Sequence, residues 1–418
     1  MITRRKFLQG TTAFFTLAGT GITLGLSSNK SANLANQRAI VQLFFRGGMD
    51  ALNFLIPRTG MNRTQYESKR PNINVPIVKT LNLNGDFGIP DTCTHLHDLY
   101  QSGKMAMIHA VGMPDGLSSR SHFESQAMFE LGTPGNSAFP TGWLARHVSS
   151  SPSISDQAII PSMSPGNPSA VLQGDSNVLS LDSVSSYNPN SGRYSEEHLS
   201  TMQEMYSGNS SIDASMQALI DNINIINDLN IVIPASYPNE TLAQGLGLIA
   251  QIIKADLGMQ VASIDFGGWD THENSGDGGL GYYVDRLGTV SAAIGAFYDD
   301  LSAAGKDDKV VLATQTDFGR RVRENGNHGT DHGTAQAMMM IGGDINGGQV
   351  FGTFPGISDG ELYLNTDLQM TTDFRLPYSD LVRNFLGNPN TDFVFPGFTG
   401  GDSMGLFPTD LIFKNGFE

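Results

Sequence analysis

The chain has 418 residues, which is enough for one large α/β domain or two smaller ones. Hydrophobic residues make up 39% of the sequence and charged residues 16%, a composition that excludes wholesale disorder. The formal net charge of −16 argues against nucleic acid as a partner, because phosphate binding needs clustered Lys and Arg.

The N-terminus resembles an export signal. Arg4, Arg5 and Lys6 precede an apolar stretch over residues 11–26 that is rich in Gly, Ala and Thr. This order is typical of signals for the twin-arginine export machinery. We therefore expect a signal peptide over residues 1–35, a periplasmic or secreted protein, and no stable membrane span after removal of the signal. A membrane anchor is the alternative, disfavoured because the apolar stretch is short and contains glycines.

Apolar runs and helical periodicity alternate along the rest of the chain. Runs of strand length lie at residues 39–45, 105–111, 260–266, 309–316 and 335–341. Helical patterns lie at residues 121–131, 212–229, 240–257, 285–301 and 378–386. This alternation predicts an α/β fold with a mostly parallel sheet that is covered on both faces.

Three further segments complete the expected organisation. Residues 149–215 are dense in Ser, Asn, Pro and Gly and are interpreted as an irregular insertion or cap with short strands. The main domain is expected over residues 38–390, and residues 391–418 form a C-terminal tail whose apolar end either docks on the body or is a sorting tag. Cys93 is the only cysteine, so no intrachain disulfide can form, and we expect it to pack as a small apolar residue rather than to act as a nucleophile.

Acidic and imidazole side chains follow the predicted strands. Asp270 and His272 come after the strand at residues 260–266 and a Gly-Gly pair, and this donor mixture suits Zn²⁺ or Mn²⁺ better than Ca²⁺. A turn with a capped helix behind it is the structural alternative for this pair. Ligands of parallel sheets bind at the carboxyl ends of the strands, so these side chains are candidates for a common site.

A second group follows the strand at residues 309–316. Asp317 ends that strand, where an unpaired buried carboxylate would be costly, and Asp331 and His332 lie between glycines that permit close approach to an ion. Arg320 and the neighbouring Arg321 could hold phosphate or sulfate oxygens. A structural Asp–Arg ion pair under a loop is an equally favoured interpretation.

A third group lies at the start of the predicted helix at residues 121–131. Ser121 and Glu124 fit a capping box, so an N-cap role is preferred for Ser121, although a helix N-terminus is also where a metal-activated nucleophile would lie. His122 could face the cleft or pack. The remaining histidines considered are expected to be ordinary surface or core residues: His95, His97, His109, His147 and His328.

Together with the signal, five motifs resemble the DUF1501 family of exported bacterial proteins over roughly residues 38–390. The motifs are Leu-Phe-Phe-Arg-Gly-Gly-Met-Asp-Ala-Leu-Asn at 43–53, Arg-Ser-His-Phe-Glu-Ser-Gln at 120–126, Gly-Trp-Asp-Thr-His at 268–272, Thr-Asp-Phe-Gly-Arg at 316–320 and Gly-Thr-Asp-His-Gly at 329–333. That family is related to the alkaline phosphatase/sulfatase superfamily. The resemblance implies a three-layer α/β/α sandwich with one or two divalent metals at the strand ends.

The resemblance also implies residue roles. The implied metal ligands are Asp50, Asp270, His272, Asp317, Asp331 and His332. Phe318 departs from the superfamily, which usually has His there, so Asp331 could supply the missing ligand or one metal could be absent. Ser121 is the first candidate nucleophile and Ser119 the second, with water as a third possibility, and Arg320 would be the clamp for the developing oxyanion.

Two functional hypotheses follow. The first is an exported metal-dependent hydrolase of phosphate or sulfate esters, with a small-molecule or polymeric substrate and one or two Zn²⁺ or Mn²⁺ ions, Ca²⁺ or Mg²⁺ being possible. The second is a noncatalytic secreted or surface binding protein that keeps a structural metal site, which Phe318 and the uncertain nucleophile favour.

Overall fold

The computed structural model describes residues 34, 36–155, 158–175, 178–181, 195–210, 212, 213, 216, 217, 220, 221, 224, 231–401 and 403–408. The expected signal peptide, most of the helix predicted at residues 212–229 and the last ten residues of the tail lie outside this part of the chain. Among the residues searched, no helix combines the length and apolar character needed to cross a membrane.

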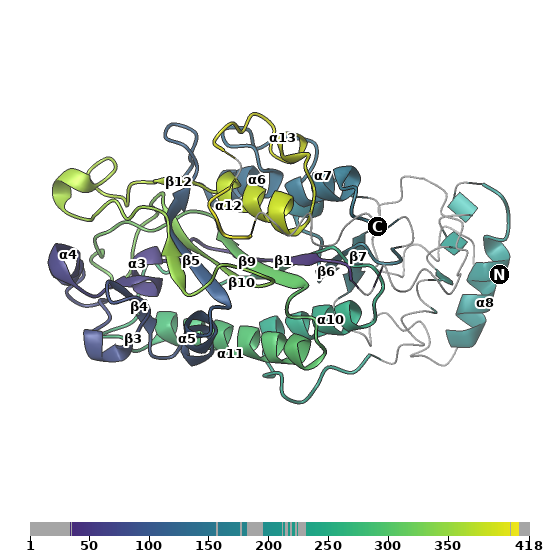
Figure 1. Ribbon diagram of the computed structural model, residues 1–418, viewed down its shortest axis with the longest axis horizontal. Helices are drawn as coiled ribbons and strands as arrows, with labels where there is room; N and C mark the ends of the chain where they lie inside the picture. Colours follow the sequence, from purple (N-terminus) through teal and green to yellow (C-terminus); the bar gives the residue numbers. More distant parts are fainter. Residues whose placement is uncertain are drawn as a thin grey trace.

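A central sheet lies between two layers of helices (Figure 1). In the described residues the sheet has nine strands, with the order β11-β5-β10-β9-β1-β8-β6-β7 and with β12 paired to β5. Its strands are β1 (Ala39–Phe45), β5 (Met105–Gly112), β6 (Ser162–Pro165), β7 (Val178–Leu181), β8 (Val261–Phe266), β9 (Val310–Thr316), β10 (Gln336–Gly342), β11 (Gln349–Phe351) and β12 (Thr372–Asp373). All neighbouring strands are parallel except β10, which runs antiparallel to both β9 and β5.

One helical layer contains α5 (Thr94–Gln101), α10 (Thr241–Lys254) and α11 (Tyr282–Ala303). The other contains α6 (His122–Leu131), α7 (Trp143–Ser150), α12 (Arg375–Asp380), the π-helical turn η5 (Leu381–Phe385) and α13 (Thr391–Val394). Strand β1 shows why both layers form, because its side chains alternate between the two apolar cores. Val41 and Leu43 pack in the first core, and Ile40 and Phe44 in the second.

Smaller elements surround this sandwich. A three-stranded sheet has the order β2 (Ile56–Pro57), β4 (Phe87–Pro90) and β3 (Thr80–Asn82). Further helices are α3 (Ala51–Phe54), α4 (Gly60–Lys69) and α8 (Ser195–Met205), with 3₁₀ turns η1 (Ile77–Lys79), η2 (Ala170–Leu172) and η4 (Asp359–Glu361).

The three-layer α/β/α sandwich with a mostly parallel sheet is confirmed, and the five predicted strands correspond to β1, β5, β8, β9 and β10. The predicted helix at residues 285–301 begins earlier, at Tyr282, and the late helix also begins earlier, at Arg375. Two short strands, β6 and β7, extend the sheet edge from within residues 149–215, in agreement with the short strands expected there.

The described part of the tail docks on the body. The carboxylate of Asp380, which is fully buried, accepts hydrogen bonds from the Ser403 hydroxyl and from the backbone N–H groups of Met404 and Leu406. Leu406 itself is buried. Cys93 packs in the core, as expected, and its burial raises the pKa of its thiol to about 12.

Buried histidines predict acid sensitivity. Burial lowers the pKa of both His109 and His147 to about 4, whereas an unfolded histidine titrates near 6.5. Between these values the unfolded chain binds protons that the folded chain does not, so the free energy of unfolding falls as the pH falls from 6.5 to 4, by about 3 kcal/mol per histidine. Urea unfolding of the wild type and of His147→Gln at pH 7.5 and pH 4.5 checks this, because the variant loses less stability on acidification. Equal losses in the two proteins would contradict it.

Candidate metal centre

The candidate residues meet at one edge of the sheet. The carboxyl ends of β1, β5, β8 and β9 lie at this edge, and β10 begins there because it runs the other way. Loops at this edge carry three side chains whose ligand atoms all lie within 4.8 Å of one another: His122, Asp270 and His332. The ligand shell of a zinc ion is about 4 Å across, so the group has the size of one coordination shell.

The tautomers of two imidazoles are set by groups that can only accept hydrogen bonds. His122 donates from Nδ1 to the carboxylate Oδ2 of Asp317 at 2.5 Å, and His332 donates from Nδ1 to the carbonyl oxygen of Arg120 at 2.8 Å. With Nδ1 protonated, each ring in its neutral form presents a lone pair on Nε2. Such outer partners of metal-binding histidines fix the ring orientation and raise the basicity of the ligand nitrogen.

Both Nε2 atoms face the carboxylate of Asp270. The Nε2 of His122 lies 3.4 Å from Oδ2 of Asp270, is buried, and has no hydrogen-bond partner, and the Nε2 of His332 lies 3.2 Å from Oδ1. Burial lowers the pKa of His332, which keeps its ring neutral. Two lone pairs and a carboxylate directed at one point repel one another unless a cation lies between them. This donor set fits a divalent metal ion.

The third imidazole of the edge belongs to His272. Its Nε2 lies 2.8 Å from Nε2 of His332 and 3.1 Å from Oδ1 of Asp270, while its Nδ1 lies 3.5 Å from Oδ1 of Asp331. The side chains of Asp270 and His272 are 47% and 43% exposed, so solvent reaches the group from their side. The cluster is therefore open on one side, as expected for a site that admits a ligand.

Asp270 is charged at neutral pH. Burial raises the pKa of its carboxyl, but the hydrogen bond and charge of Arg320, together with the nearby imidazoles, outweigh burial and lower this pKa to about 2. Burial also raises the pKa of Asp331, and the hydrogen bond from Asn325 and the charge of Arg321 outweigh it. The group therefore presents the anionic carboxylate of Asp270 beside the imidazole nitrogens of His122 and His332. This donor set suits Zn²⁺ or Mn²⁺.

Two glycines allow the loops to approach. Gly47 has φ +122°, and a Cβ there would lie 2.5 Å from the backbone nitrogen of Asp270. Gly48 has φ +74°, and a Cβ there would lie 2.6 Å from the ring of Phe318. Only glycine combines these backbone angles with this proximity, so the Gly-Gly turn after β1 is required for the cluster to form.

Asp317 lies behind the cluster. Its buried Oδ2 accepts hydrogen bonds from His122, from the Gln126 amide at 3.0 Å and from the Gly47 backbone N–H at 3.0 Å. The structure therefore places this carboxylate against His122, and places Asp331 likewise against His272, rather than in the three-residue group.

Asp50 lies apart from the group. One carboxylate oxygen caps α3 by accepting from the backbone N–H of Leu52, and the other pairs with the fully buried guanidinium of Arg70 at 2.5 Å. Its expected position after the first strand is correct, but its carboxylate is engaged in an ion pair, and we do not include it among the proposed ligands.

Arg320 is placed where it cannot hold a substrate. Its guanidinium is buried and donates to four backbone carbonyls and to Asp270, at 2.6 Å. It therefore joins the loops after β1, β8 and β9. The neighbouring Arg321 is 39% exposed, lies 3.3 Å from Asp331, and has a buried Nε without a hydrogen-bond partner.

The hydrogen bonds of Ser119 and Ser121 differ from those of the expected capping box. Ser121 is the N-cap residue of α6, but its side chain makes no capping hydrogen bond. Instead the hydroxyl of Ser119 donates to Glu124 at 2.8 Å and accepts from the backbone N–H of Ser121. The capping-box expectation is therefore wrong, and the exposed Ser121 hydroxyl is not used by the helix.

Phe318 provides the apolar wall of the cluster. Its buried ring lies 4.8 Å from the ring of His122 and 4.5 Å from that of His332, measured between centroids. The position at which the superfamily usually has a histidine is thus filled by a ring that packs on two of the imidazoles.

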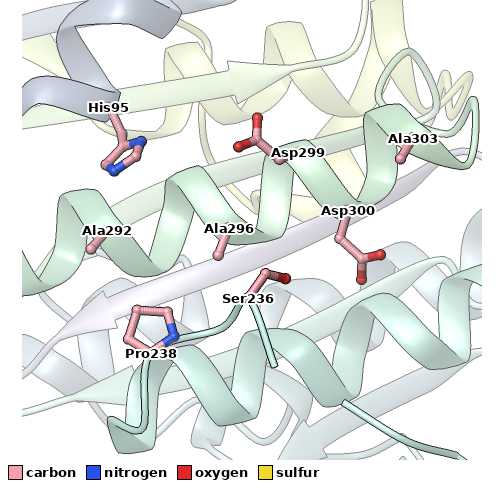
Figure 2. Close-up of a pocket in the computed structure, with 8 residues that line it drawn as sticks. All are labelled: His95, Ser236, Pro238, Ala292, Ala296, Asp299, Asp300 and Ala303. Atoms are coloured by element: carbon pink, nitrogen blue, oxygen red, sulfur yellow. The ribbon is translucent and has the colours of Figure 1, made fainter. Parts of the chain in front are cut away.

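Outside this edge, a cavity of about 360 Å³ lies in the layer of α10 and α11. Figure 2 shows that alanines of α11 form its floor, with His95 on one side and Ser236 and Pro238 on the other. The carboxylate of Asp300 at its end pairs with Lys254 at 2.7 Å. This cavity contains none of the candidate site residues.

Residues 134–385 match the family described as "Protein of unknown function (DUF1501)". Among solved structures, the chain is similar to the PsFucS1 sulfatase from Pseudoalteromonas sp. (10% identity, TM-score 0.38), covering 77% of this chain and 66% of that one. It is also similar to the lipoteichoic acid synthase LtaP from Listeria monocytogenes (9% identity, TM-score 0.39, 92% and 78% covered) and to the alkaline phosphatase from the Antarctic bacterium TAB5 (9% identity, TM-score 0.31, 75% and 94% covered). No curated protein matches the chain.

Proposed function

The chain belongs to the DUF1501 family, and from this premise and the geometry of the cluster we propose that it is an exported metal-dependent hydrolase of phosphate or sulfate esters. The observation that carries the proposal is the buried, unpartnered Nε2 of His122, which faces the carboxylate of Asp270. The phosphate or sulfate ester and the twin-arginine export route come from the sequence resemblance.

His122, Asp270 and His332 would hold one divalent ion, Zn²⁺ or Mn²⁺ by their chemistry. When bound, the ion would lower the pKa of a nearby hydroxyl or water and withdraw charge from the ester oxygens. His272, at the open side, would hold or deliver a proton beside the reacting ester. Its orientation depends on Asp331, which lies 3.5 Å from its Nδ1.

The nucleophile and the anion clamp come from exposed residues. The hydroxyl of Ser121 precedes the ligand His122 at the N-terminus of α6, where the helix dipole favours negative charge. Arg321 takes the role first expected of Arg320, because its side chain is partly exposed and pairs with Asp331 at 3.3 Å through a single nitrogen. Together these groups would hold an ester with its anionic oxygens toward Arg321.

A noncatalytic protein with a structural metal is the second candidate. The specific observation in its favour is that Arg320, the strongest oxyanion donor of the edge, is wholly engaged with backbone carbonyls and Asp270. In that case Phe318 would serve to exclude water and stabilise the imidazoles.

Metal depletion and two serine variants test the hydrolase. We expect the purified protein to hydrolyse p-nitrophenyl phosphate or p-nitrophenyl sulfate, to lose this activity in chelator, and to regain it with Zn²⁺ or Mn²⁺. With Ser121 as nucleophile, Ser121→Ala lowers kcat by at least about 100-fold, whereas the matched control Ser119→Ala retains most of it. Equal activity of Ser121→Ala and the wild type would assign the attack to water. Metal binding with no turnover of either ester would favour the second candidate.

A further inference from the structure

An ion pair outside the cluster connects to one of its imidazoles. The guanidinium of Arg120 forms a short hydrogen-bonded ion pair with Oδ2 of Asp367, a carboxylate that is fully buried. The carbonyl oxygen of the same Arg120 accepts the hydrogen bond from Nδ1 of His332 at 2.8 Å. The side chain of Arg120 is thus anchored while its backbone orients a proposed ligand.

The residues that follow Arg120 also belong to the site. Ser121 and His122 come next in the chain, so residues 120–122 supply the carbonyl that orients His332, the candidate nucleophile and one proposed ligand. The hydroxyl of Ser119 holds this segment only through the exposed Glu124. Asp367 therefore provides a buried anchor at Arg120, in addition to the one that Asp317 provides at His122.

The position of Asp367 is itself fixed. Its backbone forms a bridge with Arg321, and it exchanges both backbone hydrogen bonds with Tyr363 across a tight turn. That turn has Leu364 and Asn365 at φ +49° and +59°, left-handed values that are costly for leucine and persist only where the surrounding structure holds them.

We propose that Asp367 is a positioning residue of the metal centre: by anchoring Arg120 it fixes the carbonyl that orients His332 and thereby sets the affinity of the cluster for a divalent ion. This inference rests on the proposed metal site. Removal of the outer hydrogen-bond partner of a metal ligand typically weakens binding by about 10- to 100-fold. Asp367 touches no proposed ligand, so the effect passes through Arg120.

The test is a competition titration of the full mature chain with Zn²⁺ against a chelator of known affinity. We expect Asp367→Asn to bind Zn²⁺ about 10-fold more weakly than the wild type, at the lower end of this range, because the Arg120 carbonyl itself is retained. The visible absorption of the Co²⁺-loaded protein is a second readout, because its intensity and position report the ligand geometry, and we expect both to change. Arg120→Lys retains a cation for Asp367. It should therefore bind Zn²⁺ more tightly than Asp367→Asn, although less tightly than the wild type.

The matched control is Asp380→Asn. Asp380 is as buried as Asp367 and accepts several hydrogen bonds, but it anchors the C-terminal segment instead of residues 120–122. This variant should lose stability with an unchanged Zn²⁺ affinity. If Asp367→Asn binds Zn²⁺ as tightly as the wild type, or if both variants weaken binding equally, the positioning role is wrong and the metal site stands. If the wild type binds no Zn²⁺ or Co²⁺, the proposed function fails together with this inference.

Discussion

His332→Ala removes divalent-metal binding. Its imidazole presents Nε2 to the ion position, 3.2 Å from the carboxylate of Asp270, and its removal leaves only His122 and Asp270 of the three grouped donors. We expect the Zn²⁺ content to fall from about one ion per chain to a small fraction, with an affinity loss of at least about 100-fold. Elemental analysis and a chelator titration measure this.

The control for this variant is His95→Ala. His95 is an exposed histidine next to the cavity in the α10 and α11 layer, away from the carboxyl edge of the sheet. It should retain the wild-type metal content. A His332→Ala protein with full metal content would overturn the cluster as the metal site.

Asp50→Ala should destabilise the fold by about 3–5 kcal/mol while leaving the metal content unchanged. The loss arises because the fully buried guanidinium of Arg70 would keep its charge without a partner. Equilibrium unfolding in urea, with metal content measured on the same sample, gives both quantities. The double variant Asp50→Leu/Arg70→Met should recover much of the stability, since neither charge then remains buried.

This variant also separates two roles of the same carboxylate. Loss of metal with little loss of stability would mean that Asp50 is a ligand, as the resemblance implies, and that the ion pair with Arg70 is secondary. Loss of stability alone would mean that it is a structural residue. The hydrogen bonds of Asp50 to Leu52 and Arg70 favour the second outcome.

The sequence predicts the sheet well because its central strands are long. The strands β1, β8, β9 and β10 have six or seven residues each, and all but the last two residues of β8 are buried, so each appears as an apolar run. The region between residues 51 and 104 was not predicted, since its strands have two to four residues, too few for any periodicity. The antiparallel direction of β10 could not be predicted either, because the composition of a buried strand does not indicate its direction in the sheet.

In the candidate site, too, some residues could be predicted from the sequence and others could not. Asp270 and His332 could be identified because glycines and strand ends mark them. The sequence does not determine whether His122 faces the cleft or packs, because its partner Asp317 is 195 residues away and the sequence does not show that contact. Arg320 and Arg321 are adjacent and chemically identical, so only the backbone direction decides which side chain enters the protein and which remains at the surface.

The reversed direction of β10 has a consequence for how the centre assembles during folding. Asp317 and His332 lie at the two ends of one β9–β10 connection, so a single local pairing brings them together. His122 follows β5, which pairs with the opposite side of β10 from a position about 230 residues earlier in the chain. One proposed ligand, His332, and the outer partner Asp317 therefore come from a contiguous stretch. The complete group forms only when the segments that carry His122 and Asp270 have also reached this edge.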